Sequence, residues 1–419
     1  MADDSPPQPE ANAGFPAIFQ LTPMNPAYRE DPYAVLAELR ARCPALKDEG
    51  FGSVILTRYN DVRPMVSDLT LWRDPLKGEE GVIQRLLAGG EPPQGPRGET
   101  TSILTLDDPD HARIRQPLAQ ALYARVAGFR PEVERIVREA LEAIDASGPF
   151  DLMARFCVPI PIDVIASILG VDPGRLAEFR AWSEGVIQSL NPFRSEAQTK
   201  VMEAANAALT DYFTRLIAER KADPRDDLIS DMTRLQAQGL AVNDVELCIN
   251  LSALLIGGNL TTTDLIGNAV RLLLNNPVEL AKLRADPGLI NAVVEEALRY
   301  EPPVDATGRV ASRDMEVSGC PVKQKQAFTL FLRAANRDPE VFEDPDAFDV
   351  TRAKKPHVAF GGGAHICVGA PLARLEAQVA LLRLFERFPL LRLADPDAAP
   401  VWRTLPFFRG LEQLELRAD

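Results

Sequence analysis

Hydrophobic residues recur at intervals of three and four along much of the chain, the spacing that places them on one face of a helix. This spacing predicts helices at residues 33–43, 131–144, 160–169, 197–220, 289–299 and 371–388. Short stretches rich in β-branched and aromatic residues predict strands at 53–57, 315–317, 327–331 and 411–416. We find no internal repeat. The pattern therefore predicts a mostly α protein with a small β portion, folded as one compact unit.

A longer helix is predicted between residues 243 and 275. Asn243 and Glu246 have the spacing of a capping box at its start, and its length far exceeds the ~11–12-residue mean. Gly257 and Gly258 lie near its middle, just before three consecutive threonines. Interior glycines cost roughly 1 kcal/mol each, and threonine hydroxyls that bond back to the preceding turn bend a helix. The sequence predicts either a kink where a ligand approaches the backbone, or a core helix with a local flaw.

Charge, cysteine content and the N-terminus narrow the class of protein. The net charge of −14 argues against nucleic acid as a partner, because phosphate contacts need clustered Lys and Arg. The five cysteines show no CxxC spacing, which favours a reducing compartment over a disulfide scaffold. Residues 1–15 are rich in Asp, Pro and Ala, with no cationic start and no apolar run. We therefore expect a disordered N-terminus over 1–15, no membrane anchor and a cytoplasmic protein.

A glycine-rich loop carries the strongest chemical signal, the sequence F-G-G-G-A-H-I-C-V-G from Phe360 to Gly369. Glycines permit backbone shapes and close approaches that other residues do not. Cys367 lies in this loop just ahead of the predicted helix 371–388, where it can direct its sulfur at a flat ligand. Nearby amide N–H groups and the start of the helix favour the thiolate. The residues alone leave a buried structural cysteine in a glycine-rich turn as the alternative.

This loop closely resembles the haem-binding signature of cytochromes P450, F-x-x-G-x-H-x-C-x-G, and the next residues, A-P-L-A-R-L-E, also match that family. The resemblance extends from about residue 31 onward. It implies a single-domain, triangular, mostly α cytochrome P450 fold over residues 16–419, with haem b as the cofactor. Cys367 would be the ligand of the iron, and Phe360, Gly363 and Gly369 would belong to the cofactor site. A thiolate on haem iron favours cleavage of the O–O bond.

A second family motif resembles E-x-x-R. Glu296 and Arg299 have this spacing, which places them on one helix face where they can pair. By resemblance Arg352 is the third member of the group and locks the chain behind the cysteine loop. The implied role of the three residues is structural.

The resemblance also implies partners for the two haem propionates, which need cationic or N–H donors. The sequence D-P-D-H-A-R-I-R at 108–115 is similar to the family's D-P-x-H-x-x-x-R, which makes His111 and Arg115 implied contacts. Arg309 and His365 are the other two.

The predicted long helix contains G-G-N-L-T-T at 257–262, which resembles the family's [A/G]-G-x-[D/E]-T-[T/S]. Thr261 matches the threonine that steers protons to dioxygen in the family. Leu260 stands where the family has an acid, so the usual proton relay is in doubt. We expect Asp264, one turn further along the same face, or ordered water to replace that acid.

The resemblance implies a monooxygenase that inserts one oxygen atom from O2 into an apolar organic substrate. Electrons would come from a ferredoxin and its reductase, and the protein would be a monomer. The sequence around Leu260 also resembles the nitric-oxide-reducing branch of the family. A nitric-oxide-reducing or peroxide-using enzyme, or a haem-thiolate protein that binds a ligand without turnover, are therefore alternatives.

Two surfaces are expected from the resemblance. The ferredoxin is expected to dock near Arg113, with Arg352, Lys354 and Lys355 as further contacts; a solvated basic surface is the alternative. Substrate contacts are expected from residues 76–103, 187–193, 254–261, 304–307 and 404–408, with Asp305 and Thr307 available to orient the substrate.

Overall fold

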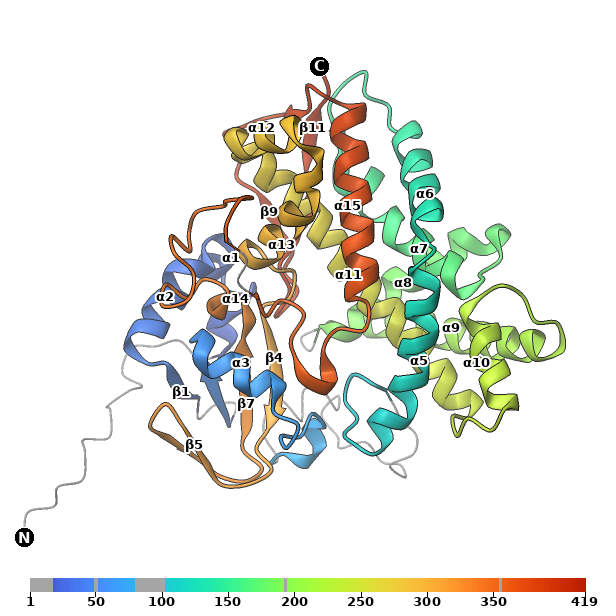
Figure 1. Ribbon diagram of the computed structural model, residues 1–419, viewed down its shortest axis with the longest axis horizontal. Helices are drawn as coiled ribbons and strands as arrows, with labels where there is room; N and C mark the ends of the chain where they lie inside the picture. Colours follow the sequence, from blue (N-terminus) through green and yellow to red (C-terminus); the bar gives the residue numbers. More distant parts are fainter. Residues whose placement is uncertain (1–17, 49–51, 80–101, 192–193, 354–355) are drawn as a thin grey trace, which may run out of the picture.

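The computed structural model describes residues 18–48, 52–79, 102–191, 194–353 and 356–419. The molecule is mostly helical and roughly triangular, with a large helical side and a β-rich corner (Figure 1). The expected disordered N-terminus, 1–15, lies outside the described residues. The predicted fold class, mostly α with a small β portion, is confirmed.

The helical side is held together by a large apolar core that draws on helices far apart in sequence. Each predicted helix is present, with its ends shifted by only one or two residues because capping decides the last turn. The helices of this side and of its upper edge are α5 (Asp110–Val126), α6 (Arg130–Glu142), α7 (Pro159–Leu169), α8 (Leu176–Ile187), α9 (Glu196–Ala222), α10 (Leu228–Ala237), α11 (Asp244–Asn275), α12 (Pro277–Ala285), α13 (Ile290–Tyr300) and α15 (Ala370–Arg387).

The β-rich corner is built on a four-stranded sheet of order β1-β2-β7-β4. β2 and β7 pair in parallel, with Val54 opposite Phe328, and the other two pairs are antiparallel. Both residues are fully or almost fully buried, since helices cover the sheet. The elements here are α1 (Pro26–Glu30), α2 (Pro32–Arg42), β1 (Ala45–Asp48), β2 (Ser53–Leu56), α3 (Tyr59–Ser67), β4 (Ala306–Val310), β7 (Ala327–Phe331) and α14 (Leu332–Ala335).

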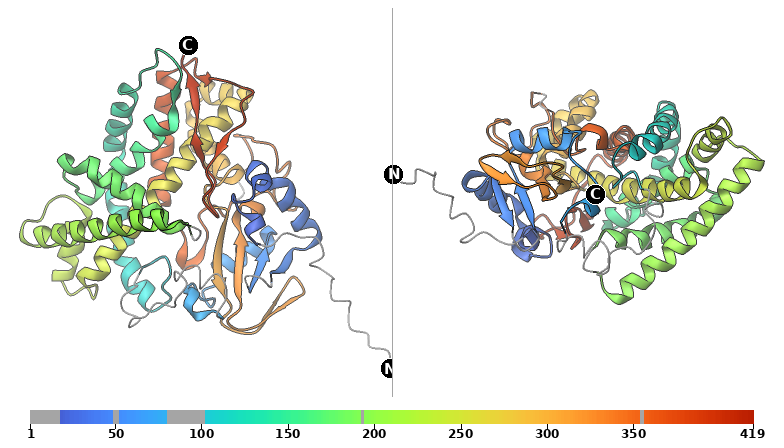
Figure 2. Two further views of the ribbon diagram at one scale, coloured as in Figure 1. Left: turned by 180° about the vertical axis from the view of Figure 1, so that it is seen from behind. Right: turned by 90° about the horizontal axis from the view of Figure 1, so that it is seen from below.

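Smaller sheets complete the fold, and one of them corrects a prediction. The predicted strand 411–416 is two strands, because Leu411 pairs with Trp402 whereas Leu416 pairs with Phe150 and Leu393. Seen from behind, the C-terminal strands run down the middle of the molecule, between its helical side and its β-rich side (Figure 2). The strands are β3 (Phe150–Asp151), β5 (Met315–Val317), β6 (Cys320–Val322), β8 (Arg392–Leu393), β9 (Val401–Trp402), β10 (Leu411–Gln413) and β11 (Glu415–Arg417).

Helix α11 is the central element of the fold. The predicted capping box is confirmed: the Asn243 side chain accepts the Glu246 N–H, and the Glu246 carboxylate accepts the Asn243 N–H, both at 2.9 Å. The helix is continuous through Gly257 and Gly258. Among the described helices it is the one long and apolar enough to span a membrane, but 61% of that apolar window is buried inside the protein. It is therefore a core helix.

Candidate active site

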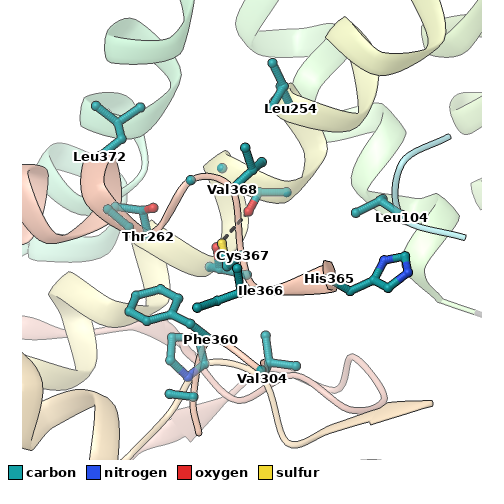
Figure 3. A pocket seen from close by; sticks show the side chains of 18 of the residues that line it. Leu104, Leu254, Thr262, Val304, Phe360, His365, Ile366, Cys367, Val368 and Leu372 are labelled. Carbon is teal, nitrogen blue, oxygen red and sulfur yellow. Dashed lines mark hydrogen bonds between the residues drawn. The ribbon is translucent and has the colours of Figure 1, made fainter. Parts of the chain in front are cut away.

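A cavity of about 290 Å³ lies between α11 and the cysteine loop at 360–369. Figure 3 shows Cys367 near its centre, with Leu254 of α11 above it and Val304 below it. Thr261 and Thr262 line the cavity from α11, so the proposed iron ligand and the proposed oxygen-activating threonine face one space. Most of the remaining wall is apolar.

The glycines of the two walls have different roles. A Cβ at Gly257 or Gly258 would meet nothing within 4 Å, so these residues widen the cavity beside the helix backbone. Gly363 has a φ of +64°, and a Cβ there would lie 3.0–3.1 Å from the backbone of Ser67 and Val66. Only glycine meets both demands, so Gly363 allows the cysteine loop to pack against α3.

The cysteine loop holds Cys367 at the cavity wall. The Cys367 N–H donates to the Phe360 carbonyl at 2.9 Å, which closes the loop before α15 begins. Burial raises the pKa of the Cys367 thiol, while the N–H groups of Gly369 and Ala370 and the Arg115 guanidinium act against that rise. The sulfur is exposed to the cavity, where a bound metal ion would favour the thiolate.

Three arginines and two histidines gather along one part of the cavity wall. Arg73, Arg115, Arg309 and His365 line it, and the ring of buried His111 lies 4.0 Å from that of His365. Burial together with these neighbours lowers the pKa of His365 to about 3. Burial and the nearby Arg73 lower the pKa of Arg309 to about 10.

The three arginines lack an adequate anionic partner among the described residues, and the Asp108 carboxylate lies 3.5 Å from His111 Nδ1 rather than beside them. Asp107 acts on Arg73 and Arg309 but is itself paired with Lys77 at 2.8 Å. His111 Nε2 is buried without a hydrogen-bond partner. Burying an unpaired charge destabilises the folded protein. A ligand with anionic groups at this wall would remove that penalty. The two propionates of haem fit this requirement, as the resemblance implied for His111, Arg115, Arg309 and His365. Arg73 was missed by the sequence analysis, because no motif surrounds it.

The E-x-x-R group lies behind the cysteine loop, and the expected third member is confirmed. The Arg299 guanidinium donates to Glu296 at 2.8 and 2.7 Å, and Arg352 Nε donates to Glu296 at 3.0 Å. Arg299 also binds the carbonyls of Asn336, Pro345 and Ala347. Glu296 and Arg299 are buried, so the group fixes the chain between α13 and the loop.

Asp264 does not lie where the sequence analysis expected it to act. Its carboxylate is fully buried and accepts hydrogen bonds from Arg403 at 2.8 and 3.1 Å. The described residues that line the cavity include Thr261, Thr262 and Leu265 of this helix but not Asp264. Asp264 therefore lies away from the cavity lining, because Arg403 of the C-terminal segment binds its side chain. Thr261 does line the cavity, with its hydroxyl donating to the Gly257 carbonyl at 2.7 Å.

A different carboxyl group lines the cavity. Glu376 of α15 is 2% exposed, and its Oε2 atom has no hydrogen-bond partner in the described part of the chain. Burial raises the pKa of Glu376 well above its usual value, which favours the protonated carboxyl group. Glu376 had no predicted role, although it is the last residue of the motif A-P-L-A-R-L-E.

The expected substrate and docking residues are found in part. Val304 and Thr307 line the cavity, whereas Asp305 is fully buried against Arg333 at 2.5 Å and does not face substrate. The expected Ile103 lines it too, as does its neighbour Leu104 just beyond the expected range, while residues 187–191 and 404–408 do not. Residues 80–101 and 192–193 of the expected contacts, and Lys354 and Lys355 of the docking group, lie outside the described residues.

The remaining docking cations are already paired. Arg113 binds Glu246 at 2.7 Å and Asp110 at 3.0 Å, and Arg352 binds Glu296. Neither arginine offers an uncompensated charge to a partner.

Comparison with known proteins matches both the fold and the site. Residues 94–401 match the family model described as Cytochrome P450. Cytochrome P450 107B1 of Saccharopolyspora erythraea is 39% identical over 88% of this chain and 90% of the relative. From the same organism, 6-deoxyerythronolide B hydroxylase is 37% identical over 94% of this chain and 97% of the relative.

Solved structures agree. P450BioI, in complex with an acyl carrier protein ligated by hexadec-9Z-enoic acid, has a TM-score of 0.83 at 32% identity, and covers 94% of this chain and 99% of that chain. The cysteine loop, the cationic wall and these matches show that the chain belongs to the cytochrome P450 family of haem-thiolate monooxygenases, which bind haem b and small-molecule substrates.

Proposed function

We propose that this chain inserts one oxygen atom from O2 into an apolar small organic molecule held between α11 and the cysteine loop. One observation carries the proposal: Cys367 and Thr261 line the same cavity from different elements. Leu104, Leu254 and Val304 give that cavity an apolar wall. Thr307 is the polar group placed to orient the substrate by a hydrogen bond.

The chain's residues fit haem b as the bound group. Cys367 would bind the iron, and Arg73, Arg115, Arg309, His111 and His365 would hold the propionates. When bound, the haem activates dioxygen with electrons and protons supplied from outside. Phe360, Gly363 and Gly369 shape the loop that keeps the sulfur facing the cavity.

Protons are proposed to reach the cavity from Glu376. Its carboxyl group lies in the cavity wall and burial raises its pKa, whereas the side chain of Leu260, in the place of the usual acid, has no proton to give. The Thr261 hydroxyl donates its hydrogen bond to the Gly257 carbonyl. Its oxygen can therefore act only as a hydrogen-bond acceptor toward the cavity. Water between Glu376 and Thr261 would complete the route.

Electrons are proposed to come from a small iron–sulfur ferredoxin and its reductase, in the cytoplasm, with the P450 acting as a monomer. The docking side is the one where the cysteine loop reaches the surface. Arg113 and Arg352 are already paired with carboxylates of the chain, so those two charges would contribute little to docking.

The test begins with a screen of purified protein for organic ligands that change the haem absorption spectrum. Ligands that bind are then incubated with a surrogate ferredoxin, its reductase, a nicotinamide cofactor and isotopically labelled O2. The proposal expects one labelled oxygen atom in the product. Nitric oxide consumption without ferredoxin, product formation only with peroxide, or binding without turnover would each support one of the alternatives instead.

A further inference from the structure

An ion pair next to the cysteine loop is not explained by the cavity or by the E-x-x-R group. Glu295 of α13 accepts two hydrogen bonds from Arg374 of α15, at 2.6 and 2.9 Å. His357 adds a third contact, with its Nε2 atom 3.2 Å from Glu295. The three side chains therefore form one cluster that joins two helices to the start of the loop.

This cluster contacts the residues that position Cys367. The Arg374 guanidinium lies 4.5 Å from the centre of the Phe360 ring. The Phe360 carbonyl in turn accepts the N–H of Cys367 at 2.9 Å. His357 Nδ1 accepts the N–H of Ala359 at 3.2 Å, which ties the same stretch of chain to the cluster.

Arg374 also acts on the sulfur through its charge. Its guanidinium stacks on Phe360, whose carbonyl binds the Cys367 N–H, so its charge lies one side chain away from the loop that holds the sulfur. How much of this charge the sulfur experiences depends on Glu295, because an opposite charge at hydrogen-bond distance cancels most of the field of a cation. Burial acts to raise the pKa of Glu295, but hydrogen bonds from His357 and Arg374 outweigh burial and lower this pKa to about 2. Glu295 is therefore ionised throughout the neutral range, and the cluster is a fixed arrangement of charge.

We propose that Glu295 is a positioning residue that sets how much of the positive charge of Arg374 reaches the Cys367 sulfur, and thereby sets the reduction potential of the bound iron. The proposal rests on Cys367 being the iron ligand. Reduction adds one electron to the iron and breaks no bond, so it makes the site more negative by one charge. Uncompensated positive charge near the sulfur stabilises the reduced site and therefore makes the reduction potential more positive.

The two partners should therefore have opposite effects. Glu295→Gln leaves Arg374 uncompensated and should shift the reduction potential to a more positive value. Arg374→Gln leaves Glu295 uncompensated and should shift it to a more negative value. The double variant should lie close to the unmutated protein. Residues that only brace the loop would instead shift the potential in one common direction when removed, because each loss would expose the site to water.

The experiment is a spectroelectrochemical titration of the haem-loaded, full-length protein without substrate. Glu386→Gln serves as the matched control, because Glu386 forms an exposed pair with Arg383 on the same helix, at 2.7 Å. This control is expected to leave the potential unchanged. Shifts of Glu295→Gln and Arg374→Gln in the same direction, or no shift in either, would overturn the proposal.

A conservative variant covers the case in which Glu295→Gln does not fold. Arg374→Lys keeps the charge but loses the planar fork, so its potential should stay closer to that of the unmutated protein than Arg374→Gln does. A potential equal to that of Arg374→Gln would contradict the proposal. The carbon-monoxide spectrum of each reduced variant reports separately on the thiolate. If the unmutated protein lacks the thiolate spectrum, the proposed function fails rather than the role of Glu295.

Discussion

The Asp264 carboxylate lies 2.8 Å from the Arg403 guanidinium, and this pair joins α11 to the segment that follows β9. The fit around it is tight, since a Cβ at Gly410 would lie 1.8 Å from Asp264 Oδ1. Burial raises the pKa of Asp264 more than Arg403 lowers it, to about 6. The pair links the two segments, but the ionised carboxylate lowers the stability of the folded protein. Its desolvation costs more free energy than the attraction of Arg403 returns.

Asp264→Asn is expected to reduce the pH dependence of stability. Because the folded pKa of about 6 lies above the unfolded value of about 3.9, the contribution of Asp264 is fully present below about pH 4 and is lost as pH rises through 6. As pH rises across this range, the free energy of unfolding of the unmutated protein should fall by up to roughly 3 kcal/mol because of Asp264. That of the variant should not show this fall. Urea unfolding of both proteins at pH 4.5 and pH 7.5 measures the difference. Parallel pH profiles would contradict the assignment.

Thr261→Ala and Glu376→Gln are expected to uncouple the reaction cycle in the same way, because both residues belong to one proton route. Reductant consumption should continue, peroxide should accumulate, and product should fall roughly ten- to a hundredfold, less than a full general-acid effect because water replaces part of it. The double variant should be little worse than either single one. The ratio of product formed to reductant consumed is the measurement.

Asp264→Asn is the control for this experiment, since Asp264 lies away from the cavity lining. It should couple as well as the unmutated protein. Uncoupling in Asp264→Asn with full coupling in Glu376→Gln would reverse the two assignments.

Arg309→Leu is expected to weaken haem retention. Arg309 is buried at the cavity wall, and a charge-assisted bond to a propionate contributes roughly 1.5–3 kcal/mol, about ten- to a hundredfold in the haem dissociation constant. Haem titration of the apoprotein measures this constant. Arg313→Leu is the control, because Arg313 is 53% exposed and pairs with Asp68 at the surface. Equal haem affinity in both variants would remove Arg309 from the propionate site.

Much of this site is encoded in local sequence, and the residues that escaped prediction depend on partners far along the chain. The capping box at Asn243 and the glycine-rich loop around Cys367 involve neighbouring residues, so their spacing predicts their geometry. The position of Asp264 away from the cavity could not be predicted, because Arg403, which binds its side chain, lies 139 residues later in the chain. Residues 411–416 were predicted as one strand, but their two halves pair with strands of two different sheets. Those partner strands are not neighbours in the sequence, so the local pattern does not show the division. Arg73 faces the cavity without any motif around it, whereas Glu376 ends a matched motif that does not say which of its side chains faces the cavity.

Glu296→Gln is expected to be strongly destabilising. It leaves Arg299, which is 2% exposed, without its carboxylate, and the loss of one partner of a buried pair costs roughly 3–5 kcal/mol. Glu139→Gln is the control, because its pair with Arg135 is exposed and contributes about 1 kcal/mol at most. Denaturant unfolding compares the two variants. A similar small loss in both would show that the E-x-x-R group does not fix the chain behind the loop.

The identity of the iron ligand is the central claim, and the carbon-monoxide spectrum of the reduced protein tests it most directly. Cys367 is expected to be the thiolate ligand, because it lines the cavity opposite α11 and its backbone is fixed by Phe360. The unmutated protein should show the spectrum of a thiolate-bound haem, and Cys367→Ser should lose it. A thiolate spectrum that persists unchanged in Cys367→Ser would contradict the account.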